Sequence, residues 1–244
     1  MPKLVREQVL FDHTHQSDFF DDFHVLDVTN TWVDTSADAG AAPALQVTGD
    51  TAVTLTTGAV DNNECLLATK MTWDIVASRP LLWEARAKCP EAATNAANYF
   101  LGMCSVGQTA DVLVDNGAGM VASFSGFGFY KVDGSTSWKW TSSVAATRYP
   151  TTDQTCSITT GSGYYSFRVE VRPISSTQAE IAPMIDSNGG NNYSQLRDST
   201  TGALIKSILT YTSYAPAYST FDVKAGSATG EVMTIDWNRV SQRR

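Results

Sequence analysis

Apolar and polar residues alternate with a period of two along most of this chain, which is the pattern of strands that bury one face. The clearest case is YSFRVEV at residues 165–171, where the odd positions are aromatic or aliphatic and the even positions are polar or charged. A polar break at residues 175–178 separates this segment from a second apolar stretch that ends at Ile185. We therefore predict a hairpin with one face on a core and its charged face toward water.

Further segments show the same alternation, and turn residues separate them. Leu45 and Val53 flank the sequence TGDT, and an Asp-Gly pair interrupts GFGFYKVDGSTSWKW at residues 126–140, so both segments are predicted to be hairpins. About a dozen strands follow from this pattern, and a sheet of that size folds over into two layers. The predicted fold is an all-β, two-sheet antiparallel jelly-roll sandwich.

The first residues break the pattern and are predicted to form an extended N-terminal arm, residues 1–18, in front of a single sandwich domain at residues 19–244. Leu10, Phe11, Phe19 and Phe20 are among the large apolar residues in and beside this arm. Aromatic anchors dominate many protein contacts, so these four residues are the candidates for binding a neighbouring subunit or another protein.

Composition supports the β assignment and narrows the classes of partner. Apolar residues make up 43% of the 244 residues and charged residues 17%, which suits a folded domain with a core. The net charge of −8 argues against nucleic acid, because phosphate binding needs a basic surface. No apolar run has transmembrane length, so no membrane partner is expected.

The four cysteines and the start of the chain bear on the compartment. Cys65, Cys89, Cys104 and Cys156 show no spacing typical of a zinc site, and we expect reduced, mostly buried thiols. The opening sequence has no apolar segment typical of a secretory signal, so we expect synthesis in a cytoplasm.

The order of the predicted strands resembles the concanavalin A-like lectin and glucanase sandwiches, over about residues 45–240. The segments that carry this resemblance, in order, are LLWEARAKC (81–89), NYFLGMC (98–104), GFGFYKVDGSTSWKW (126–140), YYSFRVEV (164–171), AEIAPMID (179–186) and VMTIDWNRV (232–240). The resemblance implies the jelly-roll sandwich predicted above.

The glucanases of this family need a cluster of the form E-x-D-x-E, which places two carboxylates across a glycosidic bond. Here Glu84 is followed by Ala-Arg, Glu170 by Val-Arg and Glu231 by Val-Met. The three histidines lie within residues 13–24 and offer no catalytic triad placed by the fold. We therefore predict no catalytic residue, no cofactor and no enzymatic activity.

Lectins of this family often bind calcium and manganese through Asp and Asn side chains. The nearest candidate is DSNGGNN at residues 186–192, in which Asp186, Asn188 and Asn191 could present oxygens. The segment lacks a closing glutamate, and Asp, Asn and Gly are common turn residues. A turn without a metal is the interpretation that we favour, so no metal site is predicted.

Two functions are compatible with a sandwich that lacks catalysis. In overall character the chain resembles the jelly-roll decoration or cement proteins of tailed-phage heads. This resemblance implies a protein made in the host cytoplasm and located on the capsid surface of the virion. Its partners would be the major capsid protein or other virion proteins, and it would form a homo-oligomer, a trimer or dimer. The alternative is a lectin-like carbohydrate-binding or receptor-attachment module.

The lectin alternative needs an aromatic platform for a sugar ring. Trp138 and Trp140 share one face of a predicted strand and are the candidates for glycan stacking. The competing interpretation, that both are large core residues of the sandwich, is the one that we favour.

Overall fold

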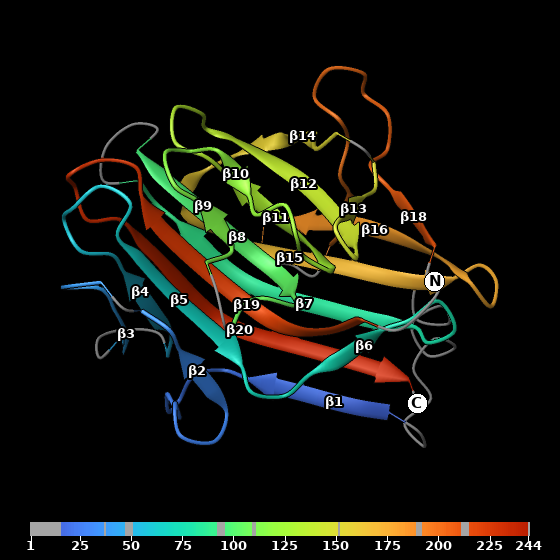
Figure 1. Ribbon diagram of the computed structural model, residues 1–244, viewed down its shortest axis with the longest axis horizontal. Coiled ribbons are helices and arrows are strands. Elements are labelled where there is room, and N and C mark those ends of the chain that lie inside the picture. The colour runs from blue at the N-terminus through green and yellow to red at the C-terminus, as the bar shows by residue number, and fades with distance from the viewer. Residues whose placement is uncertain are drawn as a thin grey trace.

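The computed structural model describes residues 16–36, 38–46, 51–91, 96–108, 111–150, 152–188, 192–210 and 215–243. These residues form twenty strands and confirm the predicted all-β sandwich of two antiparallel sheets (Figure 1). Within the described part of the chain, no helix is long and apolar enough to cross a membrane.

The first layer, here called the back sheet, has the strand order β17-β16-β15-β7-β20-β4-β3, with β1 also paired to β20 and β18 to β16. Its strands are β1 (Gln16–Asp21), β3 (Ala42–Leu45), β4 (Val53–Thr56), β7 (Leu81–Cys89), β15 (Gly161–Pro173), β16 (Gln178–Asp186), β17 (Ser194–Gln195), β18 (Ser207–Thr210) and β20 (Val232–Arg243).

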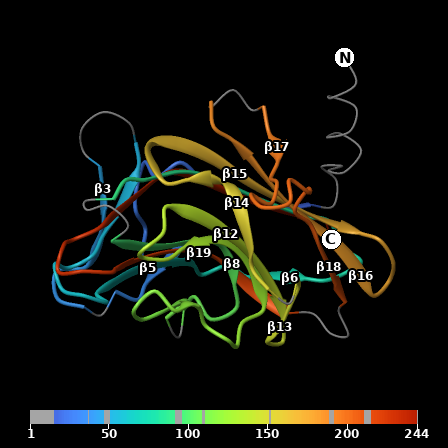
Figure 2. The same ribbon diagram turned by 90° about the horizontal axis from the view of Figure 1, so that it is seen from above.

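The second layer, the front sheet, has the order β13-β12-β11-β8-β19-β5-β2, with β14 paired to β12 and β6 to β19. Figure 2 shows the two layers stacked on one another. The front sheet contains β2 (Trp32–Asp34), β5 (Glu64–Thr69), β6 (Trp73–Ile75), β8 (Ala97–Cys104), β11 (Gly126–Lys131), β12 (Ser137–Val144), β13 (Thr147–Arg148), β14 (Gln154–Thr159) and β19 (Ala215–Ala225).

The main core lies between the sheets and is rich in aromatic rings. The Phe167 ring of the back sheet lies 5.0 Å from the Phe129 ring and 5.5 Å from the Trp138 ring of the front sheet, measured between ring centroids. The Trp83 indole N–H donates a hydrogen bond of 2.8 Å to the Ser219 hydroxyl across the same gap. Apolar burial and the hydrogen bond between Trp83 and Ser219 therefore hold the layers together.

A second apolar cluster covers the outer face of the front sheet. The segment 105–108 and 111–125, here called the covering loop, contains β9 (Leu113–Val114) and β10 (Gly119–Met120) and lies across this face. Its apolar side chains and those of the sheet beneath are buried together: Leu66, Ala68, Phe100, Cys104, Val112, Leu113, Met120, Phe124 and Tyr130. The front sheet is thus packed on both faces.

The predicted arm differs from the structure where the two can be compared. Strand β1 begins at Gln16 and pairs with the end of β20, so residues 16–18 belong to the back sheet. Phe19 packs edge-on against Trp32 and Trp73, with both ring centroids 5.8 Å away, and so anchors its own domain. Phe20 is 61% exposed. Leu10 and Phe11 lie outside the described residues.

Candidate functional site

The structure does not offer the predicted tryptophan platform. Trp138 and Trp140 are 1% and 0% exposed, and both belong to the core between the sheets. The two tryptophans alternate with other residues along β12 as predicted, but the face that they share points into the core between the sheets. Neither ring can stack on a sugar, so the favoured core interpretation is confirmed and the glycan-stacking assignment of the lectin alternative is wrong.

The loop after β16 uses its carboxylate to shape its own backbone. Asp186 is buried, and its two carboxylate oxygens accept hydrogen bonds from the backbone N–H groups of Asn188, at 2.8 Å, and Asn192, at 3.1 Å. Asn191 lies outside the described residues. Across the described ranges, no three His, Cys, Asp or Glu side chains are grouped so that they could hold a metal ion. The Asp186 carboxylate thus stabilises the turn at the end of β16.

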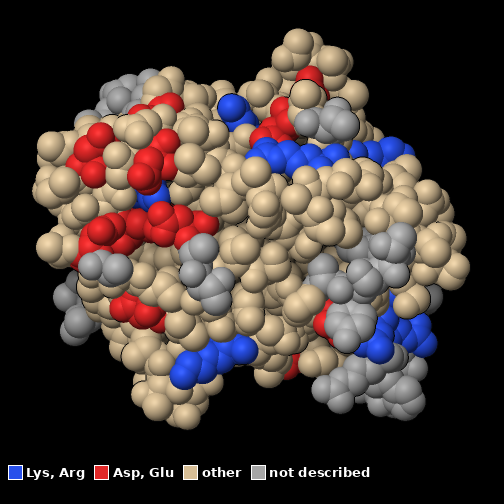
Figure 3. Space-filling model, viewed as in Figure 1, with Lys and Arg blue, Asp and Glu red and all other residues tan. Residues whose placement is uncertain are grey.

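A polar hollow of about 310 Å³ lies at one end of the front sheet. Three segments surround it, namely the residues after β2, the turn before β5 and the covering loop. Figure 3 shows acidic side chains gathered on this side of the molecule, at the left of the view. The lining residues are Thr35, Asp38, Asp61, Asn62, Asn63, Glu64, Asp111 and Asp115.

Hydrogen bonds between the three segments fix the walls of the hollow. The Glu64 backbone N–H donates to the Asp38 carboxylate at 2.6 Å, which ties the residues after β2 to the start of β5. The Asn116 backbone N–H donates to the Asn62 side-chain oxygen at 2.8 Å and so ties the covering loop to the turn. Asn62 and Asn116 have φ angles of 66° and 56°, in the left-handed region that asparagine tolerates better than most residues.

Lys224 of β19 lies beneath the rim of the hollow and is 1% exposed. Its ammonium group donates to the Asp115 carboxylate at 2.8 Å, to the Leu113 carbonyl oxygen at 2.9 Å and to the Asp111 carboxylate at 3.2 Å. Burial opposes the charged form, but the hydrogen bond to Asp115 and the nearby carboxylates raise the pKa of Lys224 overall. The lysine is therefore a charged centre that holds the covering loop.

Two further carboxyl groups lie next to this lysine. Burial is the largest cause that raises the pKa of Glu64, and the charge of Asp222 is the next. Burial likewise raises the pKa of Asp222, which is 0% exposed. Glu64 and Asp222 interact through a side-chain hydrogen bond, and the Leu113 backbone also donates to Asp222. The pair thus retains a proton more strongly than two separate carboxyl groups would.

These groups give the hollow a definite recognition chemistry. Carboxylates accept hydrogen bonds from hydroxyl groups, and asparagine side chains can both donate and accept. The carboxyl groups of the lining outnumber the one ammonium group at their centre, so anionic ligands are repelled. A neutral ligand rich in hydroxyl groups matches both properties.

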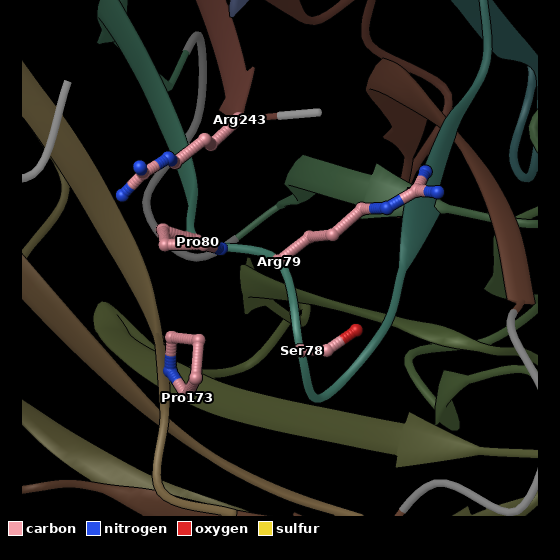
Figure 4. A pocket seen from close by; sticks show the side chains of 5 residues that line it. All are labelled: Ser78, Arg79, Pro80, Pro173 and Arg243. Carbon is pink, nitrogen blue, oxygen red and sulfur yellow. The ribbon is translucent and has the colours of Figure 1, made fainter. Parts of the chain in front are cut away.

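A second hollow, of about 460 Å³, is lined by Ser78, Arg79, Pro80, Pro173 and Arg243. Figure 4 shows the guanidinium groups of Arg79 and Arg243 pointing away from one another. Two guanidinium groups that point apart do not bind the same anion, so this hollow is a weaker candidate for a ligand site than the acidic hollow.

The residues of the acidic hollow were not predicted from the sequence. The available signal was the density of Asp and Asn in DNNE at residues 61–64 and in DVLVDN at residues 111–116. These residues are equally common in plain turns, and the two segments are about fifty positions apart. Only the course of the covering loop brings them together.

No family model matches this chain, and no curated protein matches it. Solved structures do match, at low sequence identity. The carbohydrate recognition domain of Emp47p aligns with 94% of this chain and 98% of its own, at 10% identity and a TM-score of 0.61. The lectin UEA-II, complexed with galactose, aligns with 93% of this chain and 99% of its own, at 10% identity and a TM-score of 0.55.

Two other matches extend this comparison. The exoplasmic/lumenal domain of VIP36 in its Ca²⁺/Man-bound form aligns with 86% of this chain and 82% of its own, at 9% identity and a TM-score of 0.52. A protein of unknown function from Shewanella oneidensis MR-1 aligns with 100% of this chain and 94% of its own, at 13% identity and a TM-score of 0.56. The fold is therefore that of the legume-lectin-like jelly-roll domains.

Proposed function

We propose that this chain is a lectin-like domain that binds carbohydrate, without catalysis, in the acidic hollow of the front sheet. The observation that carries the proposal is that hollow: Asp and Asn side chains converge at one end of a lectin-like sandwich. Fold similarity alone does not assign a function, and the chemistry of the site supplies the rest of the argument.

The comparisons support the ligand class. Emp47p contributes a carbohydrate recognition domain, UEA-II was solved with galactose, and VIP36 was solved in a Ca²⁺/Man-bound form. A sugar presents many hydroxyl groups in a small volume, and each of them can donate to a carboxylate or accept from an amide. The surplus of carboxylates favours neutral sugars over sialylated or sulfated ones.

Glycan binding tests the proposal. We expect a glycan array, followed by titration of the best binder, to show affinity for neutral sugars and none for their sulfated counterparts. Both measurements are made in buffer with calcium and in buffer with EDTA, and binding in either supports the proposal. If neither buffer shows binding of a neutral sugar, the proposed function is wrong.

A variant of a lining residue tests whether the sugar binds in the hollow. Asp61 lines the hollow, and among the described contacts no hydrogen bond depends on its side chain. We expect Asp61→Ala to weaken binding about tenfold, the value of one hydrogen bond to a charged group, while the melting temperature stays unchanged. Asp74→Ala removes a partly exposed carboxylate of β6 outside the hollow and is the matched control. If Asp61→Ala binds as tightly as this control, the sugar binds elsewhere.

The capsid-decoration role, with its virion location and its trimer or dimer, stays a prediction from the sequence. Phe20 is the one described member of the predicted protein-contact set that remains largely exposed, and its ring lies 6.5 Å from that of Trp237. The exposed ring is compatible with a protein contact but does not specify the partner.

A further inference from the structure

We propose that Lys224 is the positioning residue of the acidic hollow: by tying residues 111–115 to the front sheet, it holds the rim carboxylates where a ligand meets them. The effect on ligand binding rests on the proposed function. The effect on the covering loop does not, so the two can fail separately.

The hydrogen-bonding capacity of Lys224 is fully used by the covering loop. An ammonium group has three hydrogens, and Lys224 has three acceptors within 3.2 Å, at Asp111, Leu113 and Asp115. Its side chain is 1% exposed, so water cannot replace these partners. Loss of the ammonium group would leave the Leu113 carbonyl oxygen without its donor and the buried Asp222 without a neighbouring cation.

The other ties of the covering loop lie on either side of this stretch. The Gln108 side chain donates to the Thr69 carbonyl oxygen near the start of the loop. The Arg148 side chain donates to the Met120 carbonyl oxygen at 2.9 Å near its end. Asn116 joins the neighbouring turn, as described above. The stretch 111–115 between these ties is held to the sheet by Lys224 and by the buried side chains of Val112 and Leu113. Two weaker polar ties accompany the lysine, namely the Leu113 backbone hydrogen bond to Asp222 and the hydrogen bond between Asp111 and Glu64.

The same geometry leaves the second oxygen of Asp115 for a ligand, while the Asp111 carboxylate also hydrogen bonds with the Glu64 carboxyl group. Lys224 binds Oδ2 of Asp111 and Oδ1 of Asp115. These two side chains are 65% and 56% exposed, and both line the hollow. Lys224 therefore fixes the direction of both carboxylates while contacting one oxygen of each, which is the preorganisation that tight binding requires.

Lys131 provides a matched comparison, because it is a second buried lysine of the front sheet. It is 0% exposed, and its ammonium group donates to the Ala97 carbonyl oxygen at 2.6 Å and pairs with Glu91. Neither of these partners belongs to the covering loop or lines the hollow. Lys131→Met thus removes a buried charge of the same kind at a site that should not affect the loop.

The experiment compares wild type, Lys224→Met and Lys131→Met by native-state hydrogen exchange, melting temperature and glycan titration. Both variants are expected to melt at a lower temperature. We expect Lys224→Met alone to exchange about tenfold faster at the amides of residues 112–116, since local opening is governed by local contacts, and to bind the best neutral glycan at least tenfold more weakly. Asp115→Ala, which removes one of the three ties at an exposed residue, should also speed exchange of that stretch.

Each result decides the proposal. Unchanged exchange at residues 112–116 in Lys224→Met overturns it, as does equal acceleration in Lys131→Met. Faster exchange with unchanged glycan affinity also overturns it, because the loop would then move without affecting the site. If Lys224→Met does not fold, unchanged exchange in Asp115→Ala overturns the proposal. If wild type binds no glycan, the proposed function fails, and the exchange data alone decide whether Lys224 positions the loop.

Discussion

Charged side chains are paired differently on the outer faces of the two sheets. On the back sheet, Glu84 lies opposite both Arg168 and Arg239 in the strand register. Its carboxylate accepts a hydrogen bond from Arg168 at 2.8 Å and lies 3.8 Å from the Arg239 guanidinium group. Beside it, Arg86 pairs with Asp236. Charges of opposite sign therefore alternate from strand to strand, and each has a partner within the sheet.

On the front sheet, several carboxyl groups share a single cation. Lys224 has Glu64, Asp111 and Asp115 within 4 Å, and Asp222 lies on the same face of its strand. The covering loop buries this group, while the carboxylates of Asp111 and Asp115 remain partly open to the hollow. The back sheet thus has little charge left for a ligand, whereas the front sheet keeps acceptors that its own residues do not satisfy.

This difference shows where recognition chemistry can arise on a sandwich. A ladder of paired charges stabilises a sheet but offers nothing unpaired to a ligand. The covering loop brings together an apolar cluster, the buried ammonium group of Lys224 and the partly exposed carboxylates of Asp111 and Asp115. The contributions of the apolar cover and of the charge ladder to the free energy of unfolding can be measured separately.

The largest effect is expected from the apolar cover of the front sheet. Phe100 is fully buried beneath the covering loop, and Phe100→Ala should lower the free energy of unfolding by about 3–4 kcal/mol, because a buried phenyl ring is lost and a cavity remains. Phe20→Ala, at a ring that is 61% exposed, should change it by about 0.5 kcal/mol or less. Urea unfolding measures both, and equal losses would show that the covering loop does not bury this ring in solution.

An intermediate effect is expected from the charge ladder of the back sheet. The Glu84 side chain is 6% exposed, and Glu84→Ala leaves Arg168 and Arg239 facing one another without their carboxylate. Breaking a buried pair costs about 3–5 kcal/mol, and the partial exposure of these arginines reduces our expectation to about 2–3 kcal/mol. Lys206→Ala removes an exposed partner of Glu180 and should cost about 0.5 kcal/mol or less. A similarly small loss for Glu84→Ala would show that the charge ladder stabilises the chain no more than exposed surface ion pairs do.

The sequence predicted the long strands and several of their pairings because alternation and turn residues are local signals. Leu45 pairs with Val53 as the predicted hairpin requires, and Gly134 has a φ of 71° in the predicted turn of the β11–β12 hairpin. Short strands such as β2 and β6, at three residues each, are too brief for a period of two to be recognised. Their positions depend on pairing with distant strands.

The site could be predicted only in part. Alternation correctly places Asp222 and Lys224 on the face opposite Phe221 and Val223. It cannot show that this outer face is covered, because the covering loop lies more than one hundred positions away along the chain. The pattern alone is typical of a face exposed to solvent, although this face contains the buried centre of the candidate site.

The smallest effect concerns the sign of the pH dependence at the front sheet. The pKa of Glu64 is raised above its ordinary value of 4.5, so the folded chain keeps a proton that the unfolded chain releases. Stability is therefore lost as pH rises above about 4.5. Glu64→Gln removes this titration, so this variant should match wild type at pH 4 and have a larger free energy of unfolding than wild type at pH 7. Glu180→Gln on the back sheet should do the reverse at pH 7 and slightly destabilise the chain, because its carboxylate lies 3.3 Å from Lys206 and 3.9 Å from Arg172. Urea unfolding at both pH values tests the pair of variants. A Glu64→Gln difference that is constant with pH would show that the front-sheet carboxyl groups are as well paired as those of the back sheet.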